Sequence, residues 1–265
     1  MRIVSGILMQ IACTVGIIFL FGFVISLLRK LFCAVTGYAG PRILLATGII
    51  GTPIHELSHA IMCIIFGHRI RKIKLYDPDA ENGSLGYVDH SYNRRNIYHQ
   101  IGNFFIGTAP ILLGGGFILL LMYLLIPSTF FSVTRSALGI TVGSTLPIGE
   151  FFGFFFGAVW SIICSLGGIK GWIFLLLAIL IASHMELSGA DIKGGLLGLL
   201  FLLIVYIPIA VVIGLVSPTS FTALTRALAS FGTVFASLLS ISVIFLIFMI
   251  VIAAIIKIIA SLIKR

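Results

Sequence analysis

Long apolar runs fill most of the chain, and shorter polar stretches separate them. A helix that crosses a bilayer needs about 20 apolar residues, and most of these runs are that long or longer. The pattern therefore predicts an all-α polytopic membrane protein with about six transmembrane helices in a single membrane-embedded domain, residues 1–265. The expected spans cover approximately residues 3–28, 43–66, 101–126, 151–183, 192–216 and 219–263.

One long polar segment, residues 67–100, interrupts this pattern. Residues 73–76 alternate between apolar and polar, residues 85–88 can form a partner strand, and turn-forming residues lie between them at 77–79 and 81–83. This arrangement predicts a small β-hairpin at the membrane face. Three histidines in or beside the segment lack metal-ligand spacing, and we interpret them as solvated or interfacial: His68, His90 and His99.

Prolines and glycines predict breaks within several spans. Pro53, after Thr52, predicts a kink or a helix restart in the second span. Pro110 predicts a local break in the third. Residues 127–150 are expected to be less regular. Glycines within 167–171 leave two alternatives for the fourth segment, one long span or a short re-entrant helix followed by a span.

Composition supports a membrane protein and argues against a nucleic-acid-binding one. The chain is 60% hydrophobic and 9% charged, with a net charge of +9. A soluble domain of this size needs more charge, and the basic residues lie in loops and at the C-terminus, where they suit membrane lipid head groups. Four scattered cysteines show no disulfide or metal pattern, and we interpret them as small buried residues: Cys13, Cys33, Cys63 and Cys164.

Loop charge predicts the orientation of the spans. The loop after the second span holds the largest share of Lys and Arg, so we expect it, and the hairpin within it, at the cytoplasmic face. Both termini and residues 184–193 then face the cytoplasm too, in a bacterial-type plasma membrane. The first connection, with Arg29, Lys30 and Arg42, fits this orientation poorly.

A His-Glu-x-x-His motif lies inside the second apolar run. His55 and His59 are one helical turn apart, so both imidazoles can reach one zinc ion, and Glu56 can accept a proton from the attacking water. Polar side chains at this depth are costly and usually mark function. The alternative is a buried polar network in a transporter or channel. Cys63, one turn further on, could also reach the metal, but packing is its expected role.

A second polar stretch, residues 184–195, lies between two apolar segments. It contains His184, Glu186 and Asp191, and any of the three side chains can ligate a metal. Asp191 can instead cap the helix that follows, as can Ser188. We weigh capping and ligation equally for Asp191, because one carboxylate rarely serves both roles well.

Residues 51–116 resemble the site-2 protease family of intramembrane zinc metallopeptidases. The resemblance rests on the histidine motif, the following Gly67, the short strand at 73–75, the glycine-bearing hairpin and the opening of the third span at 102–110. It implies that His55 and His59 bind zinc with a later aspartate and that Glu56 is the general base. Asp191 is the best match for that aspartate, although the family's immediately following glycine is replaced by Ile192. His184 and Glu186 are the alternatives.

These features predict an intramembrane zinc metalloprotease that carries Zn2+ and hydrolyses peptide bonds in or near the membrane. The expected partners are membrane lipids and a membrane-protein or peptide substrate, with no nucleic acid. A different class stays open, a transporter or non-proteolytic membrane factor with a structural metal site, because broken helices with polar residues at mid-depth also occur in transporters. The sequence indicates neither the substrate nor the oligomeric state.

Overall fold

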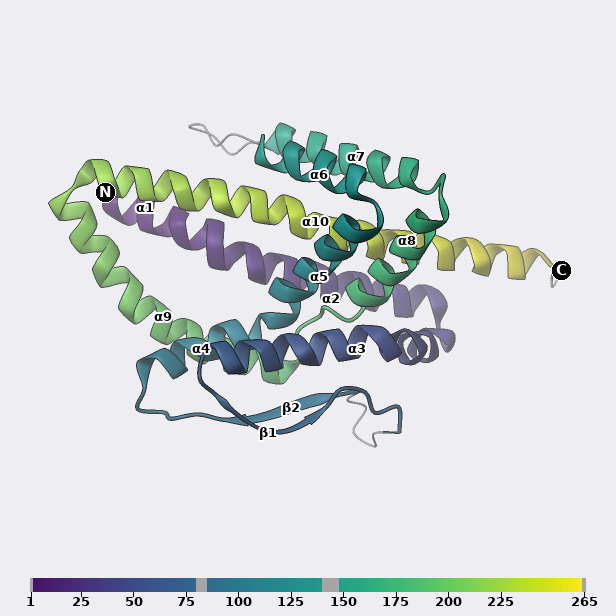
Figure 1. Ribbon diagram of the computed structural model, residues 1–265, viewed down its shortest axis with the longest axis horizontal. Helices are drawn as coiled ribbons and strands as arrows, with labels where there is room; N and C mark the ends of the chain where they lie inside the picture. The colour runs from purple at the N-terminus through teal and green to yellow at the C-terminus, as the bar shows by residue number, and fades with distance from the viewer. Residues whose placement is uncertain (1, 80–84, 140–147, 264–265) are drawn as a thin grey trace.

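The computed structural model describes residues 2–79, 85–139 and 148–263, and within these ranges the chain folds into helices and one two-stranded sheet (Figure 1). The elements in chain order are α1 (Arg2–Ile11), a π-helical turn (Ala12–Gly16), α2 (Ile17–Thr36), α3 (Ala39–Ile65), β1 (Arg69–Lys74), β2 (Tyr87–Ser91), α4 (Ile97–Gly107), α5 (Ala109–Leu125), α6 (Pro127–Leu138), α7 (Ile148–Ser165), α8 (Ile169–Ala182), α9 (Gly189–Val216) and α10 (Pro218–Ile263).

Several helices are long and apolar enough to cross a membrane. In the described part of the chain, four helices have the length and the apolar composition of a membrane span: residues 3–36, 39–65, 189–216 and 218–262. The bent pair α4 and α5 makes a fifth if it counts as one span. Many large apolar side chains point outward, among them Phe156 (66% exposed) and Leu215 (70% exposed), as lipid contact requires. The predicted all-α membrane fold is therefore confirmed.

The fourth segment is interrupted, so the alternative of one long span is wrong. Residues 148–182 form two helices, α7 and α8, separated by a turn at 166–168. The third segment breaks near Pro110 as predicted, because α4 and α5 meet at an angle of 58°. Residues 127–138, expected to be irregular, form α6, which begins at Pro127 with the proline in its first turn.

Two helix boundaries also differ from expectation. The first helix does not stop at Arg29 but continues to Thr36, because Arg29 forms an ion pair with Glu186 and can remain within the helix. Helix α3 continues through Pro53 without a restart, and Thr52 does not cap it but contacts His184 instead.

The helices pack in an order that places α3 and α9 around one cavity. In Figure 1, α10 runs beside α1 and α2, while α5 and α8 cross between that layer and α3. The largest apolar core lies where these layers meet and includes Ile25, Phe174 and Phe245. Helices α4 and α9 approach so closely that a methyl group added to Gly107 or Gly198 would clash with the opposing backbone.

The hairpin lies along the outer side of α3 (Figure 1). Its antiparallel strands pair Lys74 with Tyr87 and Ile70 with His90, and the register shifts between Ile70 and Lys72. The predicted hairpin is therefore confirmed, with its strands somewhat displaced from the expected ranges. The expected turn residues 81–83 lie outside the described residues.

Candidate metal centre

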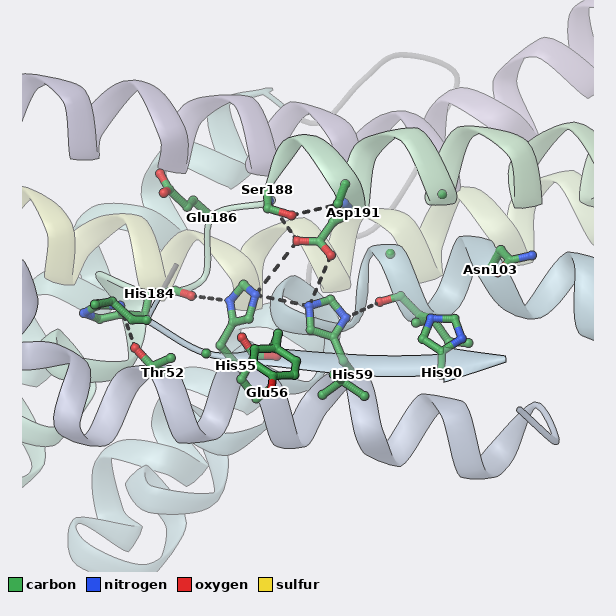
Figure 2. A pocket seen from close by; sticks show the side chains of 18 of the residues that line it. Thr52, His55, Glu56, His59, His90, Asn103, His184, Glu186, Ser188 and Asp191 are labelled. Carbon is green, nitrogen blue, oxygen red and sulfur yellow. Dashed lines mark hydrogen bonds and ion pairs between the residues drawn. The ribbon is translucent and has the colours of Figure 1, made fainter. Parts of the chain in front are cut away.

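Helix α3 presents His55 and His59 on one face, as their spacing predicts, and their rings meet edge to face (Figure 2). The two Nε2 atoms are 3.1 Å apart. Each ring is held from its other nitrogen. Nδ1 of His55 donates to the carbonyl oxygen of His184 at 2.7 Å, and Nδ1 of His59 donates to that of Ile106 at 2.8 Å.

These bonds fix the tautomer of both rings. A carbonyl oxygen only accepts, so the proton of each neutral imidazole is on Nδ1, and each Nε2 presents a lone pair. Two lone pairs at 3.1 Å repel each other unless a cation or a proton lies between them. A carbonyl that binds the far nitrogen of a ligating histidine is the usual support of a metal site. The residues present therefore fit a metal ion.

Asp191 lies against the same two nitrogens from α9 (Figure 2). One carboxylate oxygen is 3.3 Å from Nε2 of His59 and the other is 3.9 Å from Nε2 of His55. The three residues can each offer a ligand atom within 4.8 Å of the others. Ligands of a tetrahedral zinc ion are separated by roughly 3.3–3.6 Å, given bonds of about 2.0–2.2 Å. The spacing fits a three-ligand zinc site.

Asp191 also caps α9. Its Oδ2 accepts from the backbone N–H of Ser188 at 2.8 Å, while Oγ of Ser188 accepts from the backbone N–H of Asp191 at 3.1 Å. This reciprocal capping box uses one oxygen and leaves the other, Oδ1, facing His59. The structure shows the capping role of Asp191, and this role leaves Oδ1 available, because the two oxygens of one carboxylate can serve separate partners.

The two alternative third ligands are engaged elsewhere. Nε2 of His184 lies 3.0 Å from the hydroxyl of Thr47, and its backbone oxygen orients His55. Glu186 forms an ion pair with Arg29. Both residues border the same cavity, but their described partners place them around the centre, where they position other groups.

Glu56 is buried beside His55 and borders the cavity that His55, His59 and Asp191 also line. The cavity has a volume of about 540 Å³. Its walls come from α3, α4, the first turns of α9 and the stretch before it, with Arg29 of α2 and residues 85–88 and His90 of the hairpin. A carboxylate in this position can exchange protons with a water molecule at the centre, which is the role predicted for Glu56.

Asn103 of α4 also borders this cavity, and sequence reasoning did not single it out. It is buried, and its Nδ2 has no hydrogen-bond partner among the residues that the structure describes. A buried donor without a partner is costly, and in a cavity wall it suits a ligand that brings a carbonyl oxygen. A polar residue in an otherwise apolar first turn of a span was the available signal.

The solvated or interfacial position expected of the three histidines in the polar segment is wrong for His68, whereas His90 and His99 are partly exposed. His68 is buried and lies against His90, whose ring is partly buried. Burial lowers the pKa of both rings, which favours their neutral form. The uniform burial expected of the cysteines is wrong as well, because Cys63 is buried and Cys164 is exposed.

No protein-family model, curated protein or solved structure matches this chain. The resemblance to site-2 proteases therefore stays a prediction that rests on the residues and their geometry.

Proposed function

We propose that the chain is an intramembrane zinc metalloprotease of the site-2 protease type. The observation that carries this proposal is the pair of imidazole Nε2 atoms, 3.1 Å apart, with a carboxylate oxygen beside them and Glu56 in the same cavity. A catalytic zinc site has three protein ligands and one open position, whereas a structural site usually has four. Three ligands, a neighbouring carboxylate and an adjoining cavity favour catalysis over a structural role.

In this proposal His55, His59 and Asp191 hold the zinc ion. When bound, zinc polarises the scissile carbonyl and makes water a stronger acid. Glu56 accepts the proton of the attacking water and passes it to the leaving amine. The capping box keeps Asp191 oriented, and the carbonyls of His184 and Ile106 keep both imidazoles in the ligating tautomer.

The hairpin supplies a binding surface for an extended substrate. Strand β2 pairs with β1 along one edge, and residues 86–88 border the cavity. A substrate segment that pairs with β2 is extended, and its peptide bonds are open to attack, whereas those in a helix are not. The Nδ2 of Asn103 is positioned to donate to a substrate carbonyl. The substrate is a membrane-embedded or membrane-adjacent polypeptide.

The first test is the zinc content of the full chain purified in detergent. We expect one zinc ion at this centre, lost in His59→Ala and in Asp191→Ala. Zinc lost in His59→Ala but kept in Asp191→Ala would remove Asp191 from the ligand set. No zinc at the centre, even when zinc is offered, would favour the transporter or scaffold class.

The second test separates zinc binding from catalysis. Glu56→Gln keeps the size of the side chain and all three ligands, so we expect it to retain zinc and lose proteolysis. A synthetic single-span peptide with a helix-breaking proline, reconstituted with the enzyme, serves as substrate and mass spectrometry reads the products. Glu150→Gln makes the same chemical change at an exposed position of α7 and serves as the control. Cleavage by Glu56→Gln at the wild-type rate would refute the role of Glu56.

A further inference from the structure

A second group of metal-ligating side chains lies at the C-terminal end of α3. It consists of Cys63, His68 and His90, each of which can offer a ligand atom within 4.8 Å of the others. Cys63 is fully buried, His68 is 5% exposed and His90 is partly buried. The group is separate from the first centre, since His59 directs its two nitrogens at His55 and at Ile106.

The chain reversal after α3 brings these residues together. Gly67 adopts a left-handed conformation, with φ of 69°, which ends the helix and turns the chain toward β1. The backbone N–H of His68 then bonds to the carbonyl of Cys63 at 2.8 Å. The hairpin register places His90 opposite Ile70, which brings its ring against that of His68.

The hydrogen bonds of His68 repeat those of the first centre. Its Nε2 donates to the carbonyl oxygen of His99 at 2.9 Å, so its Nδ1 presents a lone pair. That atom faces Nδ1 of His90 at 3.1 Å. A histidine that binds a metal typically has one ring nitrogen bonded to a carbonyl oxygen, while its other ring nitrogen faces the metal and the neighbouring ligands. His68 has this arrangement. Cys63 adds a thiol, which a bound metal deprotonates.

We propose that Cys63, His68 and His90 form a second zinc site that fastens the hairpin to α3. One thiolate and two imidazoles suit zinc among the common divalent ions, whereas magnesium and calcium prefer oxygen. The ligands come from α3, from the residue directly before β1 and from β2, so the ion ties both ends of the strand pair to the helix. The proposal does not depend on proteolysis.

The second site adjoins the cavity of the first. His90 belongs to the Cys63 group and also borders that cavity, as do residues 86–88 of the same strand region. A two-stranded hairpin alone is marginally stable. An ion at its base therefore holds the strand that forms one wall of the cavity.

Cobalt substitution distinguishes the two sites because only the second contains a thiolate. The full chain in detergent is stripped of metal with a chelator and titrated with Co2+. We expect two cobalt ions per chain, one for each group, and a near-ultraviolet charge-transfer band from thiolate to cobalt. Cys63→Ser should remove the band and one ion, whereas His59→Ala should remove one ion and keep the band. Cys164→Ser, at an exposed position outside the group, is the matched control.

A second measurement follows the hairpin itself. In the His59→Ala chain, zinc should slow amide hydrogen exchange in β2 by about tenfold or more, since a ligand stabilises the state that binds it. The proposal is overturned if wild type takes up cobalt without a thiolate band, or if the band persists in Cys63→Ser. It is also overturned if zinc leaves β2 exchange unchanged. Should Cys63→Ser fail to fold, His90→Gln removes a ligand from β2 and should weaken the band.

Discussion

The replacement of Asp191 by asparagine separates the two roles of this residue. Asp191 is the N3 residue of the capping box, and asparagine keeps an amide oxygen that can accept from the backbone N–H of Ser188, the N-cap residue. The cap is therefore preserved in Asp191→Asn. What disappears is the negative charge of the oxygen that lies 3.3 Å from Nε2 of His59.

The size of the expected loss follows from the number of ligands. Structural zinc sites with four ligands bind with apparent free energies of about 10–16 kcal/mol, so one ligand contributes about 2.5–4 kcal/mol. Loss of the carboxylate should weaken zinc binding roughly 10²- to 10³-fold. The free energy of unfolding of the zinc-free chain should change by less than about 0.5 kcal/mol, because the cap remains.

Ser188→Ala is the matched control, since it removes the other half of the capping box. It deletes the hydroxyl that accepts from the backbone N–H of Asp191 but keeps the N–H that holds the carboxylate. We expect a stability loss of about 0.5–2 kcal/mol and a change in zinc affinity below about tenfold.

Competition with a chromophoric chelator measures zinc affinity, and thermal unfolding followed by circular dichroism measures stability. Ligation by Asp191 is refuted if Asp191→Asn binds zinc within about threefold of wild type. It is also refuted if Ser188→Ala loses as much zinc affinity as Asp191→Asn, because the carboxylate would then act only through the helix terminus.

Three further substitutions test the packing around the centre. Gly107→Ala should lower the free energy of unfolding by about 1–3 kcal/mol and lower zinc retention, because the added methyl group clashes with the backbone at the start of α9. Gly116→Ala is the control: open space surrounds this glycine, so the substitution should be neutral or stabilising in thermal unfolding. Asn103→Leu should leave stability unchanged or raise it by up to about 1–3 kcal/mol while raising the KM for the single-span peptide, and an unchanged KM would remove this residue from substrate binding. Arg29→Met should cost about 1–3 kcal/mol because it leaves the partly buried Glu186 carboxylate unpaired, and Glu186→Gln in the same chain should restore part of the loss in a double-mutant cycle.

The features that sequence predicted are those set by local chemistry. Apolar runs determine which segments become helices. The four-residue spacing of His55 and His59 places both side chains on one face of the helix. Pro110 marks the bend between α4 and α5 for the same reason, because proline changes its own helix directly. Each of these outcomes depends on a short stretch of chain, so a single sequence contains the information.

The features that sequence did not predict depend on contacts between distant segments. The burial of His68 depends on the left-handed Gly67 and on the register of the hairpin, which shifts between Ile70 and Lys72. The continuation of α2 past Arg29 depends on Glu186, far along the chain. Cys63 lies five residues before His68, and this spacing can be found in a sequence. The strand pairing that brings His90 to these two residues cannot be counted from spacing.

The contact between α4 and α9 determines which wall of the cavity can move. Backbone touches backbone at Gly107 and Gly198, so these helices have no intervening side chains whose rotation could separate them. Helix α9 also carries Asp191, and separating the pair would pull a ligand away from the centre. The hairpin wall has only two strands and contributes no ligand to that centre. We therefore expect a substrate to enter by displacing the end of the hairpin at Lys74 and Tyr87, while the other end, where His68 and His90 lie, stays fastened to α3 and the candidate ligands stay in place.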